Sequence, residues 1–212
     1  MKKLFSISLC VALSFTAVAQ QSITLSDLWQ RYSFYAGGIS GLRSMNDGAH
    51  YSATTQKTID KYSYESGEKV ATLFDIASVE GLNSFDGYSF NADETAALLE
   101  TETVGIYRYS SRSVVWLADF NSGTAKKLRD EKVRYATYSP DGQHVAYVLG
   151  NNLYAYDIAA DAHIQITNDG AFNSIINGAT DWVYEEEFAL VSAFWWSPDS
   201  RYIGFLRFDE SN

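Results

Sequence analysis

Short stretches in which apolar and polar residues alternate dominate this chain. They include 144–149, 153–156 and 202–206. Alternation with a period of two is typical of strands that bury one face of a sheet. Turn residues such as Asp141-Gly142 and Ser122-Gly123 bound these stretches. The pattern predicts an all-β fold built from short, turn-connected strands.

A turn followed at once by an apolar strand occurs four times. The aspartates of these turns lie 46, 48 and 58 residues apart, a period typical of the blades of a β-propeller. At such turns a proline fixes φ and an aspartate side chain bonds the backbone ahead of it. The four turns are Met45-Asn46-Asp47-Gly48, Phe90-Asn91-Ala92-Asp93, Tyr138-Ser139-Pro140-Asp141-Gly142 and Trp196-Ser197-Pro198-Asp199.

The repeat predicts a partial β-propeller of about three and a half blades. A generic meander with chance turns is the weaker alternative. Because a propeller removes its sheet edges by closing a ring, and this length cannot close one, we expect the biological chain to be longer. Before the first repeat, residues 26–30 are predicted to form a short capped helix that packs against the propeller edge.

The first nineteen residues have the pattern of a signal peptide. Lys2 and Lys3 precede an apolar run from Leu4 to Phe15, and Ala17-Val18-Ala19 offers a cleavage site. The apolar run is too short to span a bilayer, so no membrane insertion is expected after cleavage. We expect residues 20–212 to form the mature part of an exported protein, periplasmic or secreted.

Composition narrows the chemistry. The only cysteine, Cys10, lies in the predicted signal peptide, so neither disulfides nor a thiolate metal site is expected. No metal-ligand spacing is visible, and no cofactor is predicted. The formal net charge is −10 and no basic stripe occurs, which makes nucleic acid a poor candidate partner.

An acidic octapeptide, Asp181-Trp182-Val183-Tyr184-Glu185-Glu186-Glu187-Phe188, stands out from the remainder. Adjacent carboxylates repel each other, and burial beside aromatic residues would raise that cost. A primary ammonium would relieve it, because its three N–H donors can be shared between two carboxylates. The alternative is a solvated first turn of a helix, capped by Thr180 or Asp181.

This octapeptide falls in the longest interval of the repeat. It is therefore predicted to be an insertion between blades rather than a sheet strand, and grafted segments of this kind often carry the functional site.

The chain resembles the dipeptidyl peptidase IV family of serine exopeptidases. That resemblance implies an eight-bladed propeller over an α/β-hydrolase domain with a Ser-Asp-His triad, releasing Xaa-Pro or Xaa-Ala dipeptides from peptides with a free N-terminus. A homodimer of the full-length protein is possible. The segments that carry the resemblance are the octapeptide at 181–188, Leu98 to Arg108, and Trp195-Trp196-Ser197-Pro198-Asp199.

The same resemblance assigns the candidate substrate-binding residues. Glu186 and Glu187 would bind the N-terminal amine, and Glu185 would be the preceding, non-anchoring acid, whose replacement by alanine should matter much less. Arg108 would bind a substrate carbonyl and could pair with a nearby glutamate. Arg112 is the rival for that role.

Catalytic chemistry is not visible in this stretch. No G-x-S-x-G nucleophile motif occurs, and His50, His144 and His163 all fall in predicted strands or turns. We therefore expect the catalytic residues to be absent from this chain, and the chain to recognise an amine without cleaving a peptide. Two alternatives stay open: a non-catalytic periplasmic propeller that binds or scaffolds, and a peptidase relative with altered specificity or no activity.

Overall fold

The computed structural model describes residues 22–211 and divides the chain into two units, one ending at Gly38 and the other starting at Ile39. The predicted signal peptide lies outside the described residues. The first unit contains the short helix α2 (Leu25–Trp29), closed by a reciprocal capping box between Thr24 and Asp27. This confirms the predicted helix near residues 26–30. Its packing against the propeller stays a prediction.

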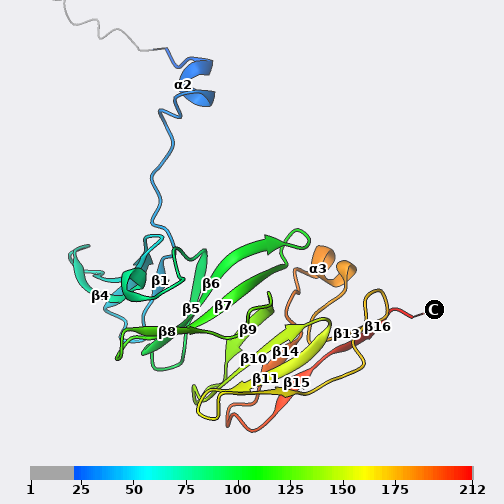
Figure 1. Ribbon diagram of the computed structural model, residues 1–212. Coiled ribbons are helices and arrows are strands. Elements are labelled where there is room, and N and C mark those ends of the chain that lie inside the picture. Colours follow the sequence, from blue (N-terminus) through cyan, green and yellow to red (C-terminus); the bar gives the residue numbers. More distant parts are fainter. Residues whose placement is uncertain (1–21, 212) are drawn as a thin grey trace, which may run out of the picture. The chain divides into compact units, whose positions relative to one another are not determined.

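The second unit consists mainly of antiparallel sheets (Figure 1). The first sheet contains β1 (Arg43–Ser44), β2 (His50–Thr54), β3 (Thr58–Ser63) and β4 (Lys69–Asp75), and a 3-10 turn, η2 (Ile76–Ser78), follows it. The second sheet contains β5 (Gly87–Phe90), β6 (Ala96–Gly105), β7 (Ser111–Asp119) and β8 (Thr124–Lys127). The third sheet contains β9 (Arg134–Tyr138), β10 (His144–Leu149), β11 (Asn152–Asp157) and β12 (Ala162–Gln165).

Two smaller pairings complete the unit. β13 (Ile175–Asn177) pairs with β16 (Arg207–Asp209), and β14 (Phe194–Trp196) pairs with β15 (Ile203–Phe205). The helix α3 (Trp182–Phe188) lies between β13 and β14 in the chain. The acidic octapeptide is therefore an insertion outside the sheets, as predicted, although it follows β13 instead of standing directly between two four-stranded sheets.

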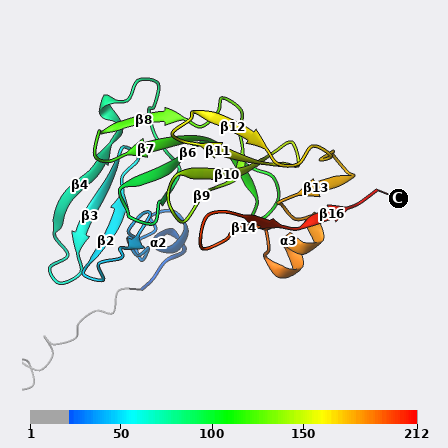
Figure 2. The ribbon, with the colours of Figure 1, turned by 90° about the horizontal axis from the view of Figure 1, so that it is seen from below.

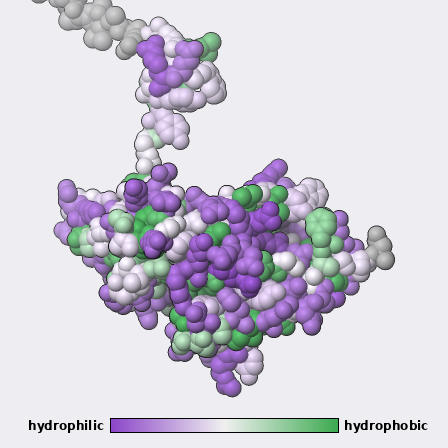
Figure 3. All heavy atoms as spheres, in the orientation of Figure 1, coloured by the Kyte–Doolittle hydropathy of each residue, from purple (hydrophilic) through white to green (hydrophobic). Residues whose placement is uncertain are grey.

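Successive sheets stack face to face, and the second and third sheets bury side chains on both faces. Neighbouring residues of one strand point to opposite faces, so Leu99 joins the core shared with the first sheet while Leu98 joins the core shared with the third. Along β10, Val145 packs toward the second sheet and Ala146 toward β13 and β14. Figure 2 shows the sheets following one another in chain order. Hydrophilic side chains dominate the face of the second unit seen in Figure 3.

The four repeated turns share one geometry. Each closes with a backbone hydrogen bond of 2.9–3.1 Å to the carbonyl three residues earlier. The donors of these bonds all have a positive φ: Gly48 (66°), Glu94 (56°), Gly142 (69°) and Ser200 (60°). Neighbouring turns also touch, because Asn46 donates to the Ala92 carbonyl and Asp141 to the Ser200 hydroxyl. The sequence repeat is therefore a structural repeat, with equivalent turns of adjacent sheets at the same end.

The all-β prediction is confirmed, and the architecture is that of a partial propeller: antiparallel sheets arranged in series and not closed into a barrel. The number of blades in a complete ring stays a prediction. Within residues 22–211, no helix is long and apolar enough to cross a membrane.

The left-handed turns make a testable prediction. We expect Gly142→Ala to lower the free energy of unfolding by about 1 kcal/mol, because a Cβ at φ 69° is strained although it meets only an ordinary contact, 3.6 Å from Asn91. Gly204→Ala is the control, since its Cβ would meet nothing within 4 Å and its φ is ordinary for an L residue. Chemical denaturation measures both. Equal effects would contradict the prediction.

Candidate functional site

Helix α3 is held by caps at both ends. Asp181 is the N-cap, with extended backbone, and its Oδ1 accepts a hydrogen bond from the Tyr184 N–H at 2.8 Å. Ala189 ends the helix in the left-handed conformation (φ 52°), where its N–H donates to the Glu185 carbonyl at 3.0 Å. The octapeptide thus forms a helix of seven residues with Asp181 as its cap, and the sequence had predicted a helix capped by Thr180 or Asp181.

The inserted segment is closed at its base. The Thr180 hydroxyl donates to the Leu190 carbonyl at 2.6 Å, and Ala179 forms an isolated antiparallel bridge with Ser192. On the helix, the Tyr184 ring meets Phe208 of β16 edge to face, with centroids 4.9 Å apart. These contacts fix the direction in which α3 projects from the sheets.

The three glutamates face different surroundings because consecutive helical residues are turned by about 100° from one another. Glu185 is buried, with 2 % of its surface exposed. The Glu186 side chain is 16 % exposed, and Glu187 is exposed. The run is therefore neither uniformly solvated nor uniformly buried.

Glu185 accepts two backbone hydrogen bonds from the β6–β7 hairpin. Its Oε1 lies 2.8 Å from the Tyr109 nitrogen and 2.9 Å from the Ser110 nitrogen. Burial raises the pKa of Glu185, but hydrogen bonds from the Ser110 side chain and from both backbone amides, together with the charge of Arg134, outweigh burial. The pKa of this carboxyl is lowered overall, so it is an anion at neutral pH.

Arg108 lies in the same hairpin and reaches the helix. Its Nε is 3.3 Å from Oε2 of Glu186, and its side chain is 64 % exposed. A hydrogen bond to Tyr109 and the charge of Glu186 raise the pKa of Arg108. The rival, Arg112, lies in β7 opposite Val104 and lines a neighbouring cleft instead. The structure thus brings Arg108 and Glu186 together, with Glu187 adjacent on the helix. Their roles as substrate ligands stay predictions.

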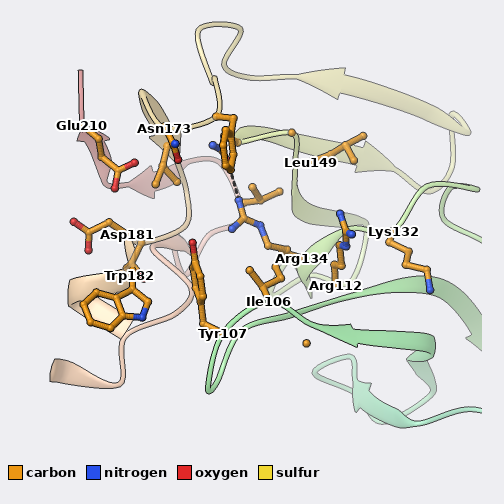
Figure 4. Close-up of a pocket in the computed structure, with 17 residues that line it drawn as sticks. Ile106, Tyr107, Arg112, Lys132, Arg134, Leu149, Asn173, Asp181, Trp182 and Glu210 are labelled. Atoms are coloured by element: carbon orange, nitrogen blue, oxygen red, sulfur yellow. Dashed lines mark hydrogen bonds between the residues drawn. The ribbon is translucent and has the colours of Figure 1, made fainter. Parts of the chain in front are cut away.

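A cleft of about 540 Å³ lies beside this site (Figure 4). Tyr107 and Trp182 stand close to each other on one side, and Arg112, Lys132 and Arg134 extend across the other. Desolvation lowers the pKa of Arg134, and the guanidinium donates to Asn151 Oδ1 at 2.7 Å. Sequence reasoning missed Arg134, because nothing in its local pattern marks it as a neighbour of the acidic helix.

The three histidines contact residues of the sheets. His50 Nδ1 lies 2.7 Å from Asp47 Oδ2, and His163 Nδ1 lies 2.9 Å from the Tyr147 hydroxyl. His144 is opposite Asp157 in the β10–β11 ladder. Among residues 22–211 no cluster of three or more side chains suited to hold a metal ion is found.

The fold and the site define a partial β-propeller with an inserted acidic helix that faces an arginine from a neighbouring hairpin. The family described as the dipeptidyl peptidase IV (DPP IV) N-terminal region matches residues 91–212, more than half of the chain. The chain belongs to this family.

Individual relatives agree with that membership. The probable dipeptidyl-aminopeptidase B of Chaetomium globosum is 34 % identical over 164 residues, covering 75 % of this chain and 16 % of the relative. The prolyl endopeptidase FAP of Bos taurus is 29 % identical over 198 residues, covering 90 % of this chain and 25 % of the relative. The chain therefore spans a quarter or less of the length of these relatives.

A solved structure, the dipeptidyl peptidase 4 of Porphyromonas gingivalis, superposes with a TM-score of 0.81. It is 37 % identical, and the match covers 91 % of this chain and 28 % of that one. A putative dipeptidyl aminopeptidase IV from Bacteroides ovatus gives a TM-score of 0.52 at 17 % identity, and so shows a likeness of fold alone.

The buried carboxylate makes a pH-dependent prediction. Because folding lowers the pKa of Glu185, its charge stabilises the fold at pH values above the ordinary pKa of about 4.3, and this contribution is lost as pH falls through the folded value. We expect Glu185→Gln to lower the free energy of unfolding by about 1–2 kcal/mol at pH 7, and the deficit to shrink below about pH 4.

Denaturation at a series of pH values measures this deficit. Glu187→Gln is the matched control, since its side chain is exposed on the same helix and should change stability little. A deficit that grows on acidification, or one shared equally by both variants, would count against the prediction.

Proposed function

We propose that this chain forms the substrate-recognising propeller part of an exported serine-type dipeptidyl peptidase that releases Xaa-Pro or Xaa-Ala dipeptides. Family membership supports the peptidase class. The names of the relatives, dipeptidyl-aminopeptidase, dipeptidyl peptidase and prolyl endopeptidase, support cleavage near peptide N-termini and after proline. The N-terminal signal pattern supports export.

The observation that carries the proposal is the ion pair between Glu186 and Arg108, with a second carboxylate, Glu187, on the next residue of the helix. Glu186 pairs with Arg108 at 3.3 Å, whereas among the described residues no basic side chain lies within 4 Å of the Glu187 carboxylate. The local set of Glu186, Glu187 and Arg108 therefore carries one uncompensated negative charge. A peptide's N-terminal ammonium supplies one positive charge and three donors, which suits two carboxylates on neighbouring residues.

Arg108 has a second task in this proposal. One nitrogen of its rigid guanidinium meets Glu186, which leaves other N–H groups of the 64 % exposed side chain available to a substrate carbonyl. The amine and the carbonyl of one terminal residue would then be bound by adjacent groups. Such a clamp fixes the distance from the N-terminus to the bond that is cleaved, which is how an exopeptidase removes a fragment of constant length.

The test compares substrates that differ only at the amine. In the protein encoded by the complete gene, Glu186→Gln or Glu187→Gln should lower kcat/KM for free-amine Xaa-Pro amides by about 30- to 1,000-fold, since each loses a charge-assisted bond worth about 2–4 kcal/mol. N-acetylated versions should be poor substrates for the wild type, and the variants should change their turnover little.

Glu131→Gln is a matched control, because Arg129 and Glu131 form an ion pair of the same 3.3 Å length elsewhere on the surface. It should leave kcat/KM unchanged. Small, equal losses at positions 185, 186 and 187 would instead identify a solvated acidic helix. Failure of the wild type to cleave either substrate would favour a non-catalytic binding module.

A further inference from the structure

Glu185, which the sequence assigns no role in binding, joins the two elements that carry the proposed ligands. It lies on α3 next to Glu186, and its Oε1 accepts the N–H groups of Tyr109 and Ser110, the two residues that directly follow Arg108. These are contacts across 76 and 75 positions of sequence. One buried oxygen therefore fixes the hairpin that presents Arg108 relative to the helix that presents Glu186.

We propose that Glu185 is a positioning residue that sets the Arg108–Glu186 geometry. The expected effect of Glu185 on turnover rests on the proposed function. Its contact with the hairpin is independent of that function. Arg108 is mostly exposed, and its ion pair with Glu186 is a single long contact of 3.3 Å. A single long contact to a largely exposed arginine contributes little to ordering a loop. The two short, charge-assisted bonds to a buried carboxylate contribute far more.

A third element completes the support. In β9 the pairing with β10 shifts by one residue between Ala146 and Val148, which marks a bulge, and Tyr135 there has a φ of 58°. Adjacent strand residues normally face opposite sides of a sheet. At this bulge both residues influence the same site, since the charge of Arg134 lowers the pKa of Glu185, and burial together with the charge of Glu185 raises the pKa of Tyr135.

The strained backbone at Tyr135 supports this assignment. A left-handed aromatic residue is unusual and strained, so surrounding contacts must over-determine it. This backbone conformation brings Arg134 and Tyr135, two adjacent residues, both within electrostatic reach of Glu185. The carboxylate is then compensated by the backbone and by Arg134, which leaves Arg108 free to serve Glu186 and the substrate.

The test is a double-mutant cycle in the protein encoded by the complete gene. We expect Glu185→Ala to lower kcat/KM for a free-amine Xaa-Pro amide about 10-fold, mainly through KM, because the hairpin loses its fixed position. This loss is smaller than that expected for Glu186→Gln, but it is larger than the sequence alone would suggest for a non-anchoring acid. In an Arg108→Ala background the same change should cost less than about 3-fold, since there is no longer a guanidinium to position. Glu185→Gln, which keeps an acceptor oxygen, should recover most of the loss.

Asp60→Ala controls for lost stability. Asp60 is another buried carboxylate, 4 % exposed and bonded to Thr58, Thr72 and Lys69, and it lies in the first sheet. It should lower the melting temperature without changing KM. Equal losses from Glu185→Ala in both backgrounds, or a KM change with Asp60→Ala, would overturn the positioning role.

Hydrogen exchange separates this inference from the proposed function. Amide exchange in residues 105–111 should accelerate at least about 10-fold in Glu185→Ala and stay unchanged in Glu186→Gln, whatever the protein cleaves. Unchanged exchange in Glu185→Ala would refute the positioning role directly. Accelerated exchange in Glu185→Ala, combined with wild-type turnover in Glu186→Gln, would support the positioning role of Glu185 and contradict the proposed amine site.

Discussion

Burial of both faces of the second and third sheets is the constraint on which the remaining structure depends. Each of these sheets is a layer between two cores, so its strands must carry apolar side chains at odd and even positions alike. Register is then strongly specified, because a slip of one residue would exchange the two cores. The equivalent turns follow from this stacking, since sheets packed in series bring their corresponding turns into contact at one end.

The positions of the side chains in the candidate site depend on that stacking of sheets. Helix α3 has seven residues, too few to be stable alone, and the hairpin bearing Arg108 projects beyond the core. Neither element would hold a position by itself. The hairpin extends from the second sheet and the bulge at Tyr135 belongs to the third, so the relative placement of these sheets decides where Glu185 finds its donors.

Much of the fold was predictable from the sequence, because its causes are local. Turn residues with fixed spacing and alternating strands signal the repeat, and the Asp181 cap signals α3. Glu94 shows the limit, since its left-handed backbone stands where other repeats have glycine or serine. The pairing of β13 with β16 was not predicted either, because the two strands are separated by the whole inserted segment and leave no local signal.

The sequence predicted which types of residue form the site, but not how their side chains are oriented. Three identical glutamates in a row do not reveal which one faces inward, because helical phase acquires meaning only when a partner surface is known. That surface is a hairpin more than seventy residues earlier in the chain. The division of labour follows from this asymmetry. Glu185 is buried and its Oε1 accepts two backbone N–H groups, whereas Glu186 is partly covered beside Arg108 and Glu187 is exposed. In the proposed function, Glu186 and Glu187 are therefore the carboxylates that a peptide ammonium would bind.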